Sequence, residues 1–138
     1  MTVEVVLVDD APSGLAEMLT RLLEANLAAH PERARLLREG TVRLHAVDAG
    51  ERVTIALAPG RVEVAVGTFD GRGGVGIRGS SRDLLDLSAA PLRFGFPDPL
   101  RPEGRDALRR IASGRIRIAG MLRRPLLLSR FARLLSVR

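Results

Sequence analysis

The sequence predicts a single α+β domain over residues 1–138, in which helices cover one face of a five-stranded, mostly antiparallel sheet. Three observations support this prediction. Apolar and polar residues alternate over 41–66, which is the period of a half-buried strand. Apolar residues recur every three or four positions over 13–30 and 125–135, as on amphipathic helices. A content of 46% hydrophobic and 28% charged residues is typical of a globular chain.

Helices are expected at 13–30, 30–40, 80–88, 102–114 and 125–135. Pro31 suits a first helical turn, and Ser80 precedes Asp83 by three residues, the spacing of a capping box. In the fourth helix, Leu108 and Ile111 are expected to face inward. The inward stripe of the last helix consists of Leu127, Phe131, Leu134 and Leu135. Anchored at one end only, this helix is expected to open without unfolding the rest.

Strands are expected at 41–47, 52–58, 61–66, 75–79 and 115–120. Each offers alternate apolar side chains to one face, and the links between the first three are short enough for hairpins. The earlier run Val3–Val8 is either an edge strand or a dimer contact. The proline-rich segment 90–102 is predicted to be an ordered surface loop.

Residues suited to catalysis or metal binding are few and scattered. The chain has no cysteine, which excludes disulfides and thiolate ligands and is compatible with a reducing compartment. His30 and His45 have no partners at metal-ligand spacing, and "RGSSR" does not match the G-x-S-x-G nucleophile motif. We therefore expect a protein that is not an enzyme and uses no metal or cofactor. No apolar run is long enough to span a membrane, and Asp9 and Asp10 end the first one, so a cytoplasmic location is expected.

The segment "GRGGVG" at 71–76 matches the letters of a dinucleotide-binding fingerprint. That fingerprint requires a helix after its last glycine, so that the helix N-terminus meets the pyrophosphate. An extended segment follows here, which favours a glycine-rich hairpin turn.

Positive charge is concentrated near the C-terminus. The net charge is +6, and residues 101–138 carry eleven arginines against Glu103 and Asp106, a local charge of +9 that leaves −3 for the first hundred residues. This asymmetry favours an anionic partner. Arg115 and Arg117 would form a short basic row on one sheet face, within reach of phosphates. Because the chain has no Trp or Tyr and four Phe, it lacks the usual stacking platforms for bases, and a solvated face is favoured over a nucleic-acid site.

Three stretches resemble the sterol carrier protein-2 (SCP2) family of small lipid-binding domains. They are "TVRLHAVDAGERVTIALAPGRVEVAVG", "VGIRGSSRDLLDL" and "SGRIRIAGMLRRPLLLSRFARLL", and the resemblance spans about residues 13–137. It implies a hydrophobic tunnel between the sheet and the C-terminal helices that holds a fatty acid, acyl-coenzyme A or a sterol. Family members also act as accessory proteins in lipid and quinone pathways. The segment "PLRFGFPDPLRPEGR" departs from the family pattern.

The leading hypothesis is a non-catalytic carrier of a lipid or similar apolar molecule. Phe94 and Phe96 are candidate gate residues, and Arg123 and Arg124 are candidates for binding a carboxylate, phosphate or membrane headgroup. The remaining predicted cavity residues are Val64, Val66, Ile77, Ile116, Ile118, Met121, Leu127, Phe131 and Leu134. The same pattern also describes a filled core, so an interaction subunit docking on a partner enzyme is the alternative. Nucleic-acid binding through the basic C-terminal region is the third hypothesis.

Overall fold

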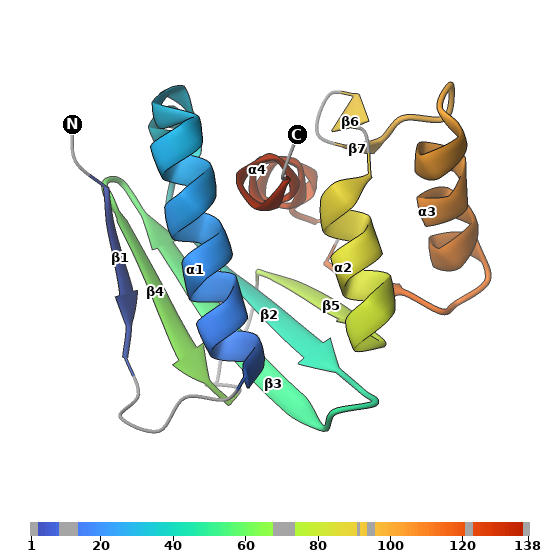
Figure 1. Cartoon of the computed structure of the whole chain (residues 1–138), viewed down its shortest axis with the longest axis horizontal. Coiled ribbons are helices and arrows are strands. Elements are labelled where there is room, and N and C mark those ends of the chain that lie inside the picture. The colour runs from blue at the N-terminus through green and yellow to red at the C-terminus, as the bar shows by residue number, and fades with distance from the viewer. Residues whose placement is uncertain are drawn as a thin grey trace.

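The computed structural model describes residues 3–8, 14–67, 74–90, 92–93, 96–120 and 123–136 (Figure 1). The helices are α1 (Gly14–Ala29), the 3-10 helix η1 (Pro31–Leu36), α2 (Ser81–Ala89), α3 (Pro102–Ala112) and α4 (Pro125–Leu135). The strands of the main sheet are β1 (Glu4–Leu7), β2 (Gly40–Ala46), β3 (Glu51–Ala58), β4 (Arg61–Val66), β5 (Val75–Gly79) and β8 (Arg117–Ala119). Leu92–Arg93 and Phe96–Pro97 form β6 and β7 of a separate antiparallel ribbon.

The main sheet has six strands in the described residues, in the order β1-β4-β3-β2-β5-β8, so the prediction of five strands was one short. The additional strand comes from the Val3–Val8 run, which forms an edge strand parallel to β4. A lone apolar run contains no information about its pairing partner, so only the fold could decide this point. β2 and β5 are also parallel, whereas β2–β3, β3–β4 and β5–β8 are antiparallel.

All helices lie on one face of the sheet (Figure 1). α1 packs along β1, β3 and β4, α4 lies against α1 and η1, and α3 packs outside α2. The strand residues beneath them alternate as predicted: Val42, Leu44 and Ala46 of β2 are buried. No helix of the described chain covers the opposite face. The structure therefore confirms a mixed α+β fold with one covered and one open sheet face.

The segment 90–102 is not simply a loop, because it contains the β6–β7 ribbon. α3 is most deeply buried at Gly104 and Ala107, whereas the predicted inward residues, Ile111 and the 36% exposed Leu108, line an apolar pocket. The physical reason is close backbone packing. A side chain at Gly104 would collide with the backbone of Asp98, so the helix approaches the segment after the ribbon with its smallest residues. Ile111 is half-buried.

The glycine-rich segment ends in a strand. β5 begins at Val75, immediately after Gly74, whose φ of 79° is in the left-handed region that glycine favours. A strand in this position cannot supply the helix N-terminus of a dinucleotide site. Residues 71–73 lie outside the described residues, so the predicted turn itself is not described here.

Candidate functional site

An apolar pocket with a volume of about 190 Å³ lies between the sheet and the C-terminal helices. The sheet contributes Ile77 of β5 and Ile118 of β8. The other walls are formed by α2, α3, α4 and the β6–β7 ribbon. Their lining residues are Leu87, Ser88, Leu92, Phe96, Pro97, Leu108, Ile111, Leu128, Phe131, Ala132 and Leu135.

The chemistry of this pocket is almost entirely that of hydrocarbon. Among the described lining residues, Ser88 alone has a polar side chain, and its hydroxyl donates a hydrogen bond of 2.7 Å to the Leu85 carbonyl in its own helix. The described walls therefore offer aliphatic and aromatic surface to a ligand and no charged group. A pocket of this kind recognises shape and apolar area rather than polar groups.

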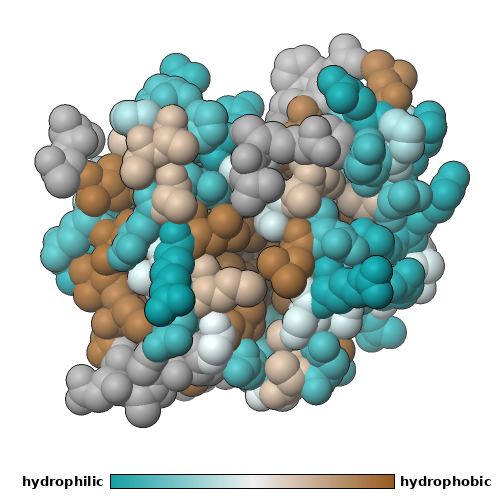
Figure 2. Space-filling view, viewed as in Figure 1, coloured by the Kyte–Doolittle hydropathy of each residue, from teal (hydrophilic) through white to brown (hydrophobic). Residues whose placement is uncertain are grey.

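A second, smaller apolar hollow of about 30 Å³ continues from the pocket. It lies between α1 and α2 above β2, and it shares Ile77, Leu87, Ser88 and Leu135 with the main pocket. Figure 2 shows apolar side chains of α1 and α2 facing each other across this depression. The apolar surface thus runs beneath the C-terminal half of α2 from the ribbon toward α1.

Four of the predicted cavity residues line the pocket: Ile77, Phe96, Ile118 and Phe131. Phe96 is 37% exposed, as expected of a residue at an entrance. Phe94 and Met121 lie outside the described residues. The remaining predicted residues do not line this pocket. Val64, Ile116, Leu127 and Leu134 are buried in the core, and Val66 is packed against it.

Two pocket residues of α4, Leu128 and Ala132, were not predicted, whereas Phe131 was predicted as a cavity residue and Leu135 as part of the inward stripe. Leu128, Ala132 and Leu135 have the spacing i, i+4, i+7 and form a second inward stripe beside Leu127, Phe131 and Leu134. A helix with two adjacent apolar stripes has a wide buried arc, and this width was the signal in the sequence. Of the predicted stripe, Leu127 and Leu134 pack into the core, and Phe131 and Leu135 line the pocket.

Arg123 and Arg124 precede α4 and are exposed, and neither lines the pocket. The backbone N–H of Arg124 donates to the Gly120 carbonyl at 2.8 Å. Their assignment to an anionic headgroup stays a prediction.

α4 is held at its C-terminal end as well as by its buried side chains, so the expectation of a helix anchored at one end was wrong. The amide of the buried Asn26 side chain donates to the Leu134 carbonyl at 3.0 Å. Arg33 of η1 donates to the Ser136 carbonyl at 2.6 Å. These bonds occupy carbonyls that a helix C-terminus leaves without intrahelical partners.

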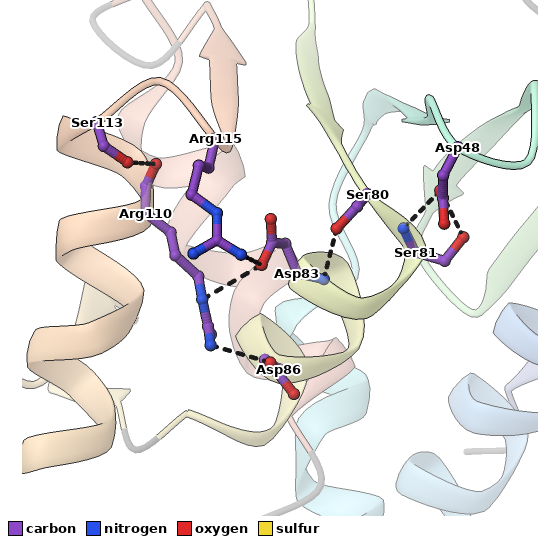
Figure 3. A network of polar contacts seen from close by, with 8 residues as sticks. All are labelled: Asp48, Ser80, Ser81, Asp83, Asp86, Arg110, Ser113 and Arg115. Atoms are coloured by element: carbon purple, nitrogen blue, oxygen red, sulfur yellow. Dashed lines mark hydrogen bonds and ion pairs between the residues drawn. The ribbon is translucent and has the colours of Figure 1, made fainter.

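A polar network fixes the opposite wall of the pocket (Figure 3). Asp83 of α2 is 3% exposed and accepts a hydrogen bond of 2.9 Å from Arg115. The guanidinium of Arg110 on α3 forms two ion pairs: Nε lies 3.3 Å from Asp83 Oδ1, and Nη2 lies 3.0 Å from Asp86 Oδ2. These contacts join α2, α3 and the segment that leads into β8. The prediction that Arg115 and Arg117 form one basic row was wrong, because Arg115 precedes the strand and pairs with Asp83.

The N-terminus of α2 is capped twice within the same region. The Ser80 hydroxyl accepts a bond of 3.1 Å from the Asp83 N–H, as the sequence spacing indicates. Asp48 accepts bonds from the Ser81 N–H at 2.8 Å and the Ser81 hydroxyl at 2.9 Å. These two bonds, the backbone one first, lower the pKa of Asp48 below its usual value.

Within the described residues, no group of three or more histidine, cysteine or acidic side chains is placed to hold a metal ion. The same residues contain no helix that is both long and apolar enough to cross a membrane. The expectations that the protein is not an enzyme and that it is cytoplasmic stay predictions.

Helices cover one face of a mixed sheet, with an apolar pocket beneath the last helix, and this arrangement is that of the SCP2-like fold. One solved structure with this fold is described as "UbiJ-SCP2 Ubiquinone synthesis protein". It matches 90% of this chain and 87% of its own with a TM-score of 0.57 and 18% sequence identity. No family model and no curated protein matches the sequence. The similarity to the SCP2 family is thereby confirmed for the fold.

Proposed function

We propose that this protein binds an apolar small molecule, or the apolar part of a lipid, in the pocket between β5, β8 and α2–α4, without chemical conversion. The observation that carries the proposal is the composition of the walls: in the part of the lining that the structure describes, the one polar side chain is that of Ser88, and its hydroxyl is already bonded to its own helix. Such walls favour a ligand segment that needs no hydrogen bond.

The volume limits what the pocket holds as it stands. A cavity of about 150 Å³ lined by aliphatic and aromatic side chains accepts benzene in another protein. The 190 Å³ found here therefore suits a ring or a short aliphatic segment. A longer chain would extend under α2 into the hollow next to α1. Each methylene that leaves water contributes about 0.8 kcal/mol, so a six-carbon segment contributes about 5 kcal/mol.

Two observations bear on the alternative of an interaction subunit with a filled core. The void beneath α4 supports the carrier, because a filled core would leave no such space. The related structure is described as a ubiquinone synthesis protein, which favours a quinone-like or other isoprenoid ligand class and an accessory role beside a pathway enzyme. A carrier and an accessory protein that binds such a ligand would both use this pocket, so identification of the ligand comes first.

Native mass spectrometry after gentle purification tests the proposal, together with uptake of a fluorescent fatty acid. We expect a bound apolar molecule or saturable uptake. The variant Ala132→Phe fills the pocket from α4 and is expected to abolish uptake. Ala25→Phe, on an exposed position of α1, is the control and should bind as the native protein does. Protein that is purified empty and takes up no probe would contradict the proposal.

A further inference from the structure

The open face of the sheet carries a row of basic side chains in register. Arg52 of β3 is the partner of His45 on β2, His45 is the partner of Arg78 on β5, and Arg78 is the partner of Arg117 on β8. We call these four residues the cationic row. Because adjacent strands are about 4.8 Å apart, the row spans about 14 Å across the sheet.

The arginines of the cationic row have no acidic partner among the described residues. Arg52, Arg78 and Arg117 are exposed, and none of them takes part in an ion pair there. At the other end of the same face, Arg61 pairs with Glu4 at 2.9 Å and with Glu63 at 2.7 Å. The open face thus has a neutralised end on β1 and β4 and a positively charged end on β3, β2, β5 and β8.

His45 lies in the middle of the row, between Arg52 and Arg78. Partial burial lowers its pKa, and the neighbouring charges of Arg52 and Arg78 lower it further. The two flanking arginines therefore disfavour a charged imidazole between them. At neutral pH the three arginines therefore supply the charge of the row.

The residues beside the cationic row are small. Register places Thr54, Ala65, Gly76 and Ala119 in the adjacent row, on either side of Arg43. Neither row contains a Phe, Tyr or Trp side chain for stacking bases or a large apolar side chain for insertion into a bilayer. Recognition on this face therefore depends on charge. The carboxylate of Glu63 lies outside the row, because Glu63 is the partner of Ala56, four residues along β3 from Arg52.

We propose that the cationic row docks a short acidic segment of a partner protein, in the form of a helix laid across the strands. On a helix, carboxylates three or four residues apart are separated by about 4.5–6 Å along the axis, which brackets the strand spacing of about 4.8 Å. Each guanidinium can then bind one carboxylate through paired N–H groups. The docking face lies on the opposite side of the sheet from the apolar pocket, so the proposal is independent of the pocket's ligand.

The probe is a labelled, alanine-based helical peptide with glutamates at i, i+4 spacing, measured by fluorescence anisotropy at low salt. The row variant combines Arg52→Gln, Arg78→Gln and Arg117→Gln. Its control combines Arg21→Gln, Arg105→Gln and Arg133→Gln, which are exposed on α1, α3 and α4. Both triple variants lower the formal net charge from +6 to +3, so they differ in position alone.

We expect native protein to bind the peptide, the row variant to bind about tenfold more weakly and the control to change less than about twofold. Equal weakening in both triple variants, or no binding by native protein, overturns the proposal. A DNA duplex and phosphatidylserine vesicles are measured in parallel. Tighter, row-dependent binding of either one overturns it in favour of a nucleic acid or a membrane. Circular dichroism verifies folding, and the single reversal Arg78→Glu replaces the row variant if that variant unfolds.

Discussion

The side-chain amide of Asn26 donates a hydrogen bond of 3.0 Å to the Leu134 carbonyl and thereby joins the first helix to the last. The two residues are 108 positions apart, and both are buried. This bond and the one from Arg33 to Ser136 close the end of α4 that lies against α1 and η1. The C-terminal end of α4 is therefore expected to stay in place when a ligand enters the pocket.

The variant Asn26→Ala should destabilise the fold by about 1–3 kcal/mol, because it leaves a buried carbonyl without its donor. Urea unfolding monitored by circular dichroism measures this change. Arg21→Ala, an exposed position on the same helix, serves as the control and should shift the free energy of unfolding by less than about 0.5 kcal/mol. Equal stabilities of the two variants would show that the Asn26 bond contributes nothing.

The variant Asp83→Asn should destabilise the fold by about 1–3 kcal/mol, since it removes a buried carboxylate that binds Arg115 and Arg110. The partial exposure of both arginines keeps the loss below that of a fully buried pair. Asp106→Asn breaks the exposed pair with Arg109 and should cost about 0.5 kcal/mol or less. Thermal melting of both variants compares them. If both variants lower the melting temperature by the same amount, the burial of Asp83 adds no stability.

The variant Gly104→Ala should destabilise the protein by about 1–3 kcal/mol and weaken ligand uptake, because the new methyl group meets the backbone of Asp98 next to the ribbon. Gly14→Ala is the matched control at the start of α1, where the nearest atom, Glu51 Oε1, lies at an ordinary 3.8 Å. Stability and fluorescent fatty-acid uptake are measured on both. Native-like uptake by Gly104→Ala would show that ligand binding does not depend on the packing of α3.

The variant Ser88→Ala should leave the affinity for an apolar probe within about twofold of the native value, because the hydroxyl bonds its own helix rather than a ligand. Titration with a fluorescent fatty acid gives the comparison, and Ala132→Phe provides the reference for a blocked pocket. A tenfold loss in Ser88→Ala would instead indicate a polar ligand group next to α2.

The stabilising contribution of Asp48 should depend on pH. Its pKa in the folded protein is lowered, so the contribution of the carboxylate is complete above the unfolded pKa and is lost as pH falls through the folded pKa. Native protein should therefore exceed Asp48→Asn in stability at neutral pH, and the difference should vanish in strong acid. Urea midpoints of both proteins across this range test it. A difference that does not change with pH would rule out a contribution from the charge.

The sequence by itself determined most of the elements and most of the sheet. Alternating apolar residues predict β2, β3 and β4, and the glycine before β5 marks where that strand begins. Periodicity and backbone preference are local properties of the sequence. The Ser80 cap and the buried stripe of Leu127, Phe131 and Leu134 follow from the same kind of signal. Such features need no knowledge of what lies across the core.

The tertiary structure decided which apolar residues enclose space and which fill it. Leu127 and Leu128 are adjacent and equally apolar, yet one packs against Gly40 in the core and the other lines the pocket. The pairing of β1 with β4, the bond from Asn26 to Leu134 and the alignment of the cationic row likewise join distant segments. Hydropathy measures how strongly a side chain avoids water, but whether a protein atom or a void faces it depends on how the elements pack.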